Sequence, residues 1–140
     1  MRVLFTGGSS FTGYWFIREL CAKGCEVTAT FRQKPGEYAD PGRRQRVELA
    51  ATLCHPEYGV GFGDERFLAL VRGGGWDLLC HHAADVTNYK SPDFDFQGAL
   101  LNNTRALSAV LGALREQGCR RVLLTGSVFE AGEGAGSEGL

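Results

Sequence analysis

The sequence lacks a strong charge of either sign and lacks any long hydrophobic run. Among 140 residues, fifteen basic side chains stand against sixteen acidic ones, so the net charge of −1 gives no electrostatic basis for binding nucleic acid or an anionic membrane surface. No apolar run approaches the length of a membrane span, and the N-terminus has no hydrophobic signal segment. We therefore expect a cytoplasmic protein with neither a nucleic acid nor a membrane as its partner.

The five cysteines lack the spacing of a disulfide framework or of a metal site. None forms a Cys-x-x-Cys pair and their number is odd, which disfavours a disulfide scaffold. The neighbours Cys54-His55 and His81-His82 have no second ligand pair at zinc-finger spacing, so we expect no bound metal. With 44% hydrophobic and 22% charged residues, the composition predicts one globular domain over residues 1–140.

What the sequence does contain is a glycine-rich turn near its N-terminus. Residues 3–5 have the composition of a short buried strand, and an amphipathic helix is predicted to begin at residue 11 or 12 and to end at residue 23. The N-terminus of such a helix presents unpaired backbone N–H groups, and glycines let a phosphate approach them closely. We therefore expect the turn to bind the diphosphate of a dinucleotide through the following residues: Gly7, Gly8, Ser10, Phe11, Thr12 and Gly13.

The spacing of these glycines departs from the G-x-G-x-x-G pattern at one position. In that register Gly8 and Gly13 match, but Ser10 stands where the second glycine allows the closest approach of the backbone to the phosphates. Ser10 could instead donate its hydroxyl to a phosphate oxygen. An ordinary strand-to-helix turn without a ligand is the alternative interpretation.

Strand and helix patterns alternate along the rest of the chain, which predicts an α/β fold with a doubly wound parallel sheet. Further strands are predicted over residues 25–31, 59–63, 76–84 and 121–125. Helices are predicted from residue 64 or 65 to residue 71 and over residues 97–117. The polar residues 33–46 are typical of a surface loop, whereas residues 47–54 fit a helix or a strand equally well.

One arginine bears on the choice of cofactor. Arg32 lies 19 positions beyond Gly13, where a carboxylate would hydrogen-bond the adenosine ribose of NAD and a cation would meet the 2′-phosphate of NADP. No Asp or Glu occurs in residues 28–36. We therefore expect NADP as the cofactor, with NAD as second choice, and Arg32 as the ligand of the 2′-phosphate. A solvated surface arginine is the alternative, and other cations expected nearby are Arg43, Arg44 and Arg46.

In this order the elements resemble the N-terminal part of an extended short-chain dehydrogenase/reductase, the group that includes NAD(P)-dependent nucleotide-sugar epimerases and dehydratases. Residues 6–13 are similar to the family's T-G-x-x-G-x-x-G turn, and residues 122–130 are similar to its fifth strand and S/T-x-x-V-Y-G element. The resemblance covers essentially the whole chain. It implies that residues 1–140 form an NAD(P)-binding Rossmann domain, incomplete on its C-terminal side and without the substrate-binding part.

The resemblance also implies roles for residues outside the turn. Asp64, in Gly63-Asp64, stands where the family places an aspartate against the adenine. Residues 81–84 look like the family's H-x-A-A after strand four, which implies that the cofactor is lined by His82, Ala83 and Ala84. Two hydroxyl residues are candidates for polarising the substrate carbonyl or hydroxyl, namely the catalytic candidates Thr125 and, second, Ser127.

The family's general base, a tyrosine with a lysine four residues later, has no counterpart in this chain. We expect the parent protein to be an oxidoreductase, epimerase or dehydratase that transfers hydride to or from a carbonyl or sugar-like substrate, with the pair supplied outside these residues. The alternatives are a non-catalytic NADP(H) sensor and an α/β domain in which Ser10 blocks nucleotide binding. The sequence leaves open whether the protein forms a homodimer. An uncovered edge at the fifth strand predicts poor solubility of the isolated chain.

Overall fold

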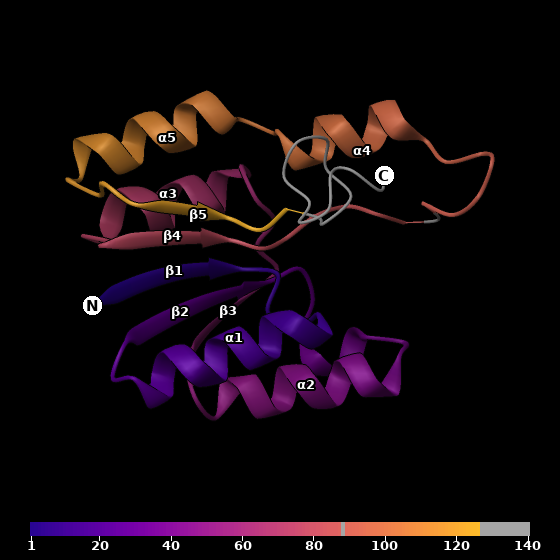
Figure 1. Ribbon diagram of the computed structural model, residues 1–140, viewed down its shortest axis with the longest axis horizontal. Coiled ribbons are helices and arrows are strands. Elements are labelled where there is room, and N and C mark those ends of the chain that lie inside the picture. The colour runs from indigo at the N-terminus through magenta and orange to yellow at the C-terminus, as the bar shows by residue number, and fades with distance from the viewer. Residues whose placement is uncertain (88, 127–140) are drawn as a thin grey trace, which may run out of the picture.

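The computed structural model describes residues 1–87 and 89–126, and within them the chain forms a five-stranded sheet with helices on both faces (Figure 1). The strands are β1 (Arg2–Thr6), β2 (Glu26–Phe31), β3 (His55–Tyr58), β4 (Leu78–His81) and β5 (Val122–Leu124). Their spatial order is β3-β2-β1-β4-β5, and every neighbouring pair is parallel. The order reverses between β1 and β4, as in a doubly wound Rossmann fold, so the predicted fold class is confirmed.

The helices form a layer on each side of the sheet. One layer contains α1 (Phe11–Ala22) and α2 (Pro41–Ala51), and the other contains α3 (Glu65–Gly73), α4 (Phe96–Asn103) and α5 (Leu107–Glu116) (Figure 1). A short 3-10 turn, η1 (Pro35–Glu37), precedes α2. No helix within the described residues is long and apolar enough to cross a membrane.

Successive residues of β1 enter two different hydrophobic cores, because side chains alternate between the faces of a strand. Phe5 belongs to the core that contains Ile17 of α1, whereas Leu4 belongs to the core that contains Phe67 of α3 and Val110 of α5. Each of these five side chains is fully buried. The central strand is therefore packed on both faces, as a parallel sheet requires.

The boundaries of α1 follow the signals in the sequence. Ser10 caps the helix with its side chain, and Ile17 points into the core. Lys23 is the C-terminal cap residue, and Gly24 follows with a φ of +78°, a conformation that glycine adopts without strain. The predicted first helix is confirmed.

The third strand lies earlier in the chain than predicted. We expected it over residues 59–63, but β3 covers His55–Tyr58. Gly59 and Gly63 have φ values of +68° and +74°, which turn the chain away from the extended conformation. Pro56 argues against a strand in the sequence, because proline cannot donate a backbone hydrogen bond to a neighbouring strand. β3 is an edge strand, however, and a proline is tolerated there.

The segment predicted as a loop over residues 33–46 contains the start of α2. Asp40 caps this helix by accepting a hydrogen bond from the backbone N–H of Arg43, and Pro41 occupies the first helical position. A Pro-Gly pair such as Pro41-Gly42 is typical of a turn, but proline is also favoured in the first turn of a helix, where its missing N–H costs nothing. Val47 and Ala50 lie on the inner face of α2 and are fully buried.

The helix predicted over residues 97–117 is broken in two. Helix α4 ends at Asn103 and α5 begins at Leu107, and between them Ala106 adopts a left-handed conformation with a φ of +50°. An alanine gives no sequence signal for such a break, because this conformation is normally taken by glycine or asparagine.

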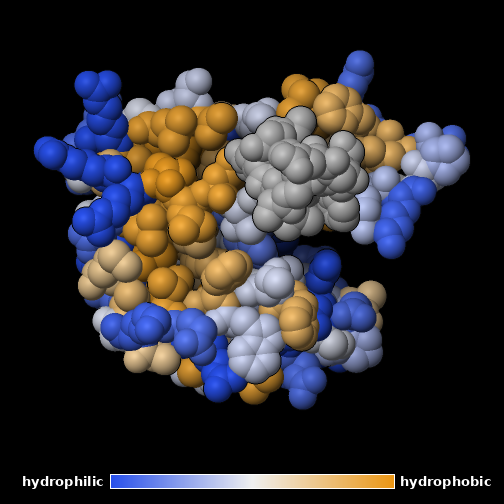
Figure 2. Space-filling model, in the orientation of Figure 1, coloured by the Kyte–Doolittle hydropathy of each residue, from blue (hydrophilic) through white to orange (hydrophobic). Residues whose placement is uncertain are grey.

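The outer strand of the sheet presents apolar side chains to its surroundings. Val122, Leu123 and Leu124 of β5 are exposed by 50%, 47% and 71%. Figure 2 shows apolar side chains gathered over β5 and the adjoining part of α5, where Leu107 and Leu111 are also exposed. The predicted uncovered edge at the fifth strand is present within the described residues.

Candidate functional site

A cavity of about 620 Å³ opens at the carboxyl ends of β1, β2 and β4. The strand order reverses between β1 and β4, and ligands of open α/β sheets bind outside the carboxyl ends of the strands at such a reversal. Six of the predicted site residues line the cavity, and they come from the segments that follow these strands: Gly7, Ser10, Arg32, His82, Ala83 and Ala84. The structure thus brings together residues that are far apart in the sequence.

Glycine is required in the turn after β1 because the backbone has no room for a side chain. Gly7 has a φ of +85°, and a Cβ atom there would lie 2.7 Å from the backbone nitrogen of Ala83. A Cβ atom on Gly8 would lie 2.7 Å from Cδ1 of Ile17, and one on Gly13 would collide with the carbonyl oxygen of Gly7. The turn is therefore packed tightly against both β4 and its own helix.

Ser10 uses its hydroxyl inside the protein. Its Oγ atom accepts a hydrogen bond from the backbone N–H of Gly13 at 3.0 Å and donates one to the carbonyl of Gly7 at 3.0 Å. This arrangement caps α1, so the serine at the second glycine position has a structural role that the spacing did not reveal.

The first turn of α1 offers unpaired hydrogen-bond donors. Among the described residues, no acceptor is found for the backbone N–H groups of Gly8, Ser9, Phe11 and Thr12. Unpaired N–H groups and the positive end of the helix dipole together make an anion-binding position. The predicted diphosphate site has the donors it needs.

His82 lies directly over this helix N-terminus. Its Nε2 atom is 2.9 Å from Oγ1 of Thr12 and 3.1 Å from Oγ of Ser10. The ring also packs against Phe5 and Phe16, with ring centroids 6.1 Å and 5.4 Å away. Burial lowers the pKa of His82, so the neutral imidazole is favoured. Nδ1 is buried without a partner among the described residues.

The neighbouring His81 fixes the floor of the cavity. Its Nδ1 atom lies 2.8 Å from Oγ1 of Thr6, which also accepts a hydrogen bond from the backbone N–H of Ala83 at 3.1 Å. The imidazole stacks on Phe62 with a centroid distance of 4.0 Å. Burial, with a smaller contribution from the adjacent His82, lowers the pKa of His81 to about 4.

Helix α2 brings two arginines to the site. Arg43 lines the cavity together with Arg32, and Arg46 donates from Nε to the carbonyl of Ser9 at 3.2 Å. Arg44 instead donates to the carbonyl of Tyr38 at 3.1 Å. The sequence predicts these arginines near the site, but it does not predict the helix α2 that carries them there.

The carboxylate of Asp85 is not part of the cavity wall but lies between two of its residues, Ala84 and Val86. Asp85 accepts a hydrogen bond from the side-chain amide of Asn102 at 2.9 Å, and the backbone N–H of Thr87 donates to it at 3.2 Å. These hydrogen bonds lower the pKa of Asp85, and the positive charge of Arg32 adds a small effect in the same direction. The negative charge of Asp85 therefore offsets a small part of the positive charge of Arg32.

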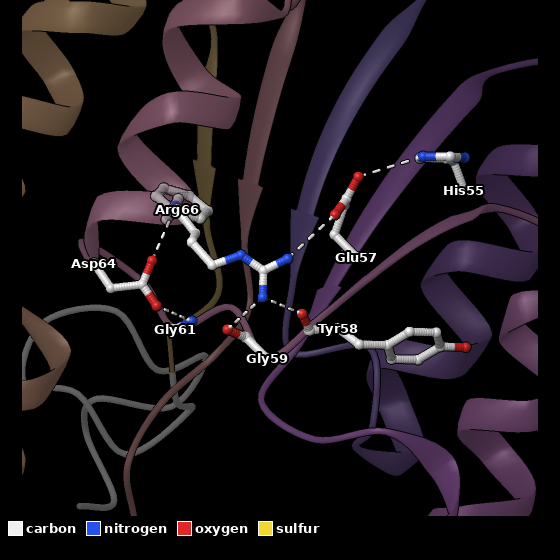
Figure 3. Close-up of polar contacts among 8 residues, drawn as sticks. His55, Glu57, Tyr58, Gly59, Gly61, Asp64 and Arg66 are labelled. Carbon is white, nitrogen blue, oxygen red and sulfur yellow. Dashed lines mark hydrogen bonds and ion pairs between the residues drawn. The ribbon is translucent and has the colours of Figure 1, made fainter.

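The carboxylate of Asp64 accepts hydrogen bonds from the loop that precedes it and from α3 (Figure 3). Asp64 does not line the cavity. One carboxylate oxygen accepts from the backbone N–H of Phe67 at 2.7 Å, capping α3, and the other accepts from Gly61 at 2.7 Å. The cavity wall is formed instead by the residues just before it, Val60, Gly61 and Phe62. Its predicted contact with adenine stays a prediction.

An arginine on α3 holds the start of this loop. Nη1 of Arg66 donates to the carbonyl oxygens of Tyr58 and Gly59 at 2.8 Å and 3.2 Å, and Nη2 lies 3.9 Å from Glu57 (Figure 3). Glu57 in turn lies 3.4 Å from His55. Together, Asp64 and Arg66 fix the loop after β3 on both sides of Gly61.

Of the two catalytic candidates, only Thr125 lies within the described residues. Thr125 follows β5, is exposed, and donates its backbone N–H to the carbonyl of His81 at 3.2 Å, but it is not part of the cavity wall. Ser127 lies outside the described residues. Of the remaining turn residues, Phe11 and Thr12 are exposed at the start of α1.

A second cavity, of about 490 Å³, lies beside α3 and away from the glycine turn. Its wall includes Arg2, Thr28, Glu57, Arg66 and Trp76, and it contains none of the predicted site residues. Its wall includes Arg2 and His55, the first residues of β1 and β3, whereas ligands of open α/β sheets bind at the carboxyl ends of the strands. The first cavity is therefore the better candidate for a phosphate-containing ligand.

Known proteins similar to this chain share the same architecture. No family model matches the sequence. A dTDP-4-dehydro-6-deoxy-D-allose reductase from a Streptomyces species is 32% identical over 126 residues, which are 89% of this chain and 37% of the relative. The chain therefore spans little more than a third of the curated relative.

Two solved structures illustrate the likeness in fold. The UDP-glucose-4-epimerase from Stenotrophomonas maltophila with bound NAD superposes with a TM-score of 0.65 at 22% identity, over 91% of this chain and 37% of that one. Gre2 from Candida albicans in complex with NADPH gives a TM-score of 0.62 at 19% identity, over 91% and 37% of the two chains.

The strand order, the glycine turn and the cavity at the reversal define a Rossmann-type nucleotide-binding domain. In its motifs and in its similarity to the curated reductase, the chain resembles the N-terminal part of an extended short-chain dehydrogenase/reductase.

Proposed function

We propose that residues 1–140 are the NAD(P)-binding domain of a reductase or epimerase that acts on a sugar nucleotide by hydride transfer. The observation that carries the proposal is the cavity at the β1/β4 reversal, beside the glycine turn and the N-terminus of α1. There, the backbone N–H groups of Gly8, Ser9, Phe11 and Thr12 have no acceptor among the described residues. The names of the similar proteins, a sugar-nucleotide reductase and an epimerase with bound NAD, support the same class of reaction.

The residues of the site fit a dinucleotide. Gly7 and Gly13 leave the backbone bare where a diphosphate would lie, and the free N–H groups would hold its oxygens. Tyr38 and His82 line the cavity, and each has a buried polar side-chain atom without a partner among the described residues. When bound, the cofactor supplies the nicotinamide ring that accepts or donates the hydride.

The proposed cofactor is NADP, with NAD as second choice. Arg32 follows β2, where a cation would meet a 2′-phosphate, and Arg43 lines the same cavity. Two guanidinium groups can bind a phosphate through several charge-assisted hydrogen bonds. Asp85 offsets part of this positive charge, which keeps NAD as the alternative.

For the chemistry, Thr125 is the proposed hydroxyl that polarises the substrate, with Ser127 as the second candidate. Thr125 is joined to His81 at the cavity end of β4 through its backbone N–H. The proposed general base, a tyrosine assisted by a lysine, would come from outside these residues, because no tyrosine here has a lysine four residues later.

The proposal is tested by titrating the chain with NADPH and with NADH while following the cofactor fluorescence. We expect saturable binding of both, with NADPH binding more tightly. No change in the fluorescence of either cofactor, together with no heat of binding, would contradict the proposal.

A non-catalytic NADP(H) sensor is the second candidate, because the chain contains no Tyr-x-x-x-Lys pair. The two functions differ in turnover. Tight binding of NADPH by the full-length gene product, without reduction or epimerisation of any dTDP- or UDP-linked sugar, would favour the sensor.

A further inference from the structure

The hydrogen bonds around His82 allow its tautomer to be assigned. The single hydrogen of the Ser10 hydroxyl is donated to the carbonyl of Gly7, since Oγ lies 3.0 Å from that oxygen. Ser10 can therefore only accept a hydrogen bond from Nε2 of His82, 3.1 Å away. A bare Nε2 would instead place two lone pairs opposite each other. The hydrogen of the neutral imidazole accordingly lies on Nε2.

The same N–H settles the direction of the contact with Thr12. Nε2 of His82 lies 2.9 Å from Oγ1 of Thr12, so the N–H is shared between the two hydroxyl oxygens. Because Oγ1 accepts this hydrogen bond, Thr12 keeps its own hydrogen for another acceptor. Thr12 is exposed in the first turn of α1, beside the unpaired backbone N–H groups.

We infer that His82 is a positioning residue that turns the hydroxyl of Thr12 toward the cofactor diphosphate, an inference that rests on the proposed function. Thr12 thus adds a side-chain donor to the backbone donors of the helix N-terminus. His82 is held for this task by Phe5 and Phe16, which contact its ring. His82 and Thr12 together supply this hydrogen bond to the diphosphate. Ser10, at the second glycine position of the turn, instead accepts a hydrogen bond from Gly13 within the protein.

The charged groups around His82 do not alter this assignment. His81 precedes it on β4 and bonds to Thr6 of β1. Arg32 and Arg43 line the cavity and Asp85 lies beside it, and within the described residues none of the three forms a hydrogen bond to the imidazole. The neutral form is favoured because burial lowers the pKa of His82.

The test is a double-mutant cycle on the dissociation constant of NADPH. Thr12→Val, which removes the hydroxyl at nearly constant volume, should weaken NADPH by about tenfold, as expected for a hydrogen bond to a charged group. Thr12→Ser is the matched control and should change it by less than about twofold. His82→Phe should weaken binding by roughly three- to tenfold, and His82→Gln, which retains an N–H donor, should restore most of the loss.

The double variant T12V/H82F should bind no more weakly than T12V alone, because His82 acts through Thr12. Additive losses would overturn the inference. Adenosine 2′-monophosphate, which has no diphosphate, should bind equally well to all variants, whereas a merely structural role of His82 would weaken it together with NADPH.

The tautomer can be measured independently from the imidazole ¹⁵N chemical shifts of the free protein. A protonated Nε2 and a bare Nδ1 support the inference, and the opposite tautomer overturns it. If wild-type protein binds neither NADPH nor NADH, both the proposed function and this inference fail. If it binds NADPH but T12V binds it equally well, only this inference fails.

Discussion

The central strand β1 divides the sheet into a β2 side and a β5 side, and the apolar strands of these two sides are buried to different extents. On the side of β2, the strand residues that follow Glu26 are all buried, with α1 and α2 packed over one face. On the side of β5, all three strand residues are exposed. The comparison shows that strand composition alone does not determine burial, since β5 has the apolar composition typical of central strands.

The candidate site draws on both sides, but unequally. The cations come from the β2 side, through Arg32 after the strand and Arg43 on α2. The β4 side contributes small and neutral groups, Ala83, Ala84 and Asn102. A dinucleotide lying across the β1/β4 reversal would therefore have its anionic end held by one side of the sheet.

The largest expected difference between the sides is in packing energy. Phe31→Ala in β2 should lower the free energy of unfolding by about 3–5 kcal/mol, because the side chain is fully buried. Leu124→Ala in β5 is the matched variant and should change it by less than about 0.5 kcal/mol, because Leu124 is 71% exposed. Urea unfolding followed by circular dichroism measures both. Equal losses would contradict the comparison.

Acid should lower the stability of the fold through His81, which pairs with Thr6 where β4 meets β1. Its pKa is lowered from 6.5 to about 4 in the folded protein, so the unfolded chain takes up the proton first as the pH falls. Stability is therefore lost below about pH 6.5, reaching roughly 2–3 kcal/mol near pH 4.

Unfolding of wild type and of His81→Leu across this pH range isolates the effect. The wild-type curve should fall more steeply than that of His81→Leu. A difference between wild type and His81→Leu that does not change with pH would argue against a buried neutral His81.

The cationic side of the site should control the choice of cofactor. Arg32→Asp should weaken NADPH by about 1–3 kcal/mol, the range for a lost charge-assisted hydrogen bond, and leave NADH unchanged or improved. Isothermal titration of both cofactors provides the measurement. Equal losses for NADPH and NADH would show that Arg32 does not meet the 2′-phosphate.

The smallest expected effect lies on the other side, at the break between α4 and α5. Ala106→Gly should raise stability by about 0.5–1 kcal/mol, because glycine adopts the φ of +50° without strain. Gly118→Ala, at a φ of +83°, is the reciprocal control and should lower stability by about 1 kcal/mol. Thermal melting of the two variants distinguishes them, and shifts in the same direction would exclude backbone strain as the cause.

Much of the fold could be predicted because its signals are local. The apolar run before Gly7, the helix stop at Gly24 and the cap at Asp64 each act within a few residues. β3 and the break at Ala106 could not, because they depend on tertiary context. A strand that contains Pro56 is stable only at an edge, and only packing can hold an alanine in a left-handed conformation.

The site was predictable where backbone geometry demands a particular residue. Gly7 and Gly13 are required by contacts with Ala83 and with the turn itself. The capping role of Ser10 is local, since Ser10 bonds to Gly7 and Gly13, and a serine just before a helix is a capping signal. The contact between Ser10 and His82 could not be predicted, because it joins residues 72 positions apart. Side-chain partners across a sheet leave no mark in local spacing.

The central claim is that the N-terminus of α1 binds a cofactor diphosphate, and amide chemical shifts of the ¹⁵N-labelled chain during an NADPH titration test it most directly. We expect the largest shifts at the four unpaired N–H groups, those of Gly8, Ser9, Phe11 and Thr12. Shifts confined to the second cavity near Arg66 and Trp76, or no shifts at all, would contradict the account.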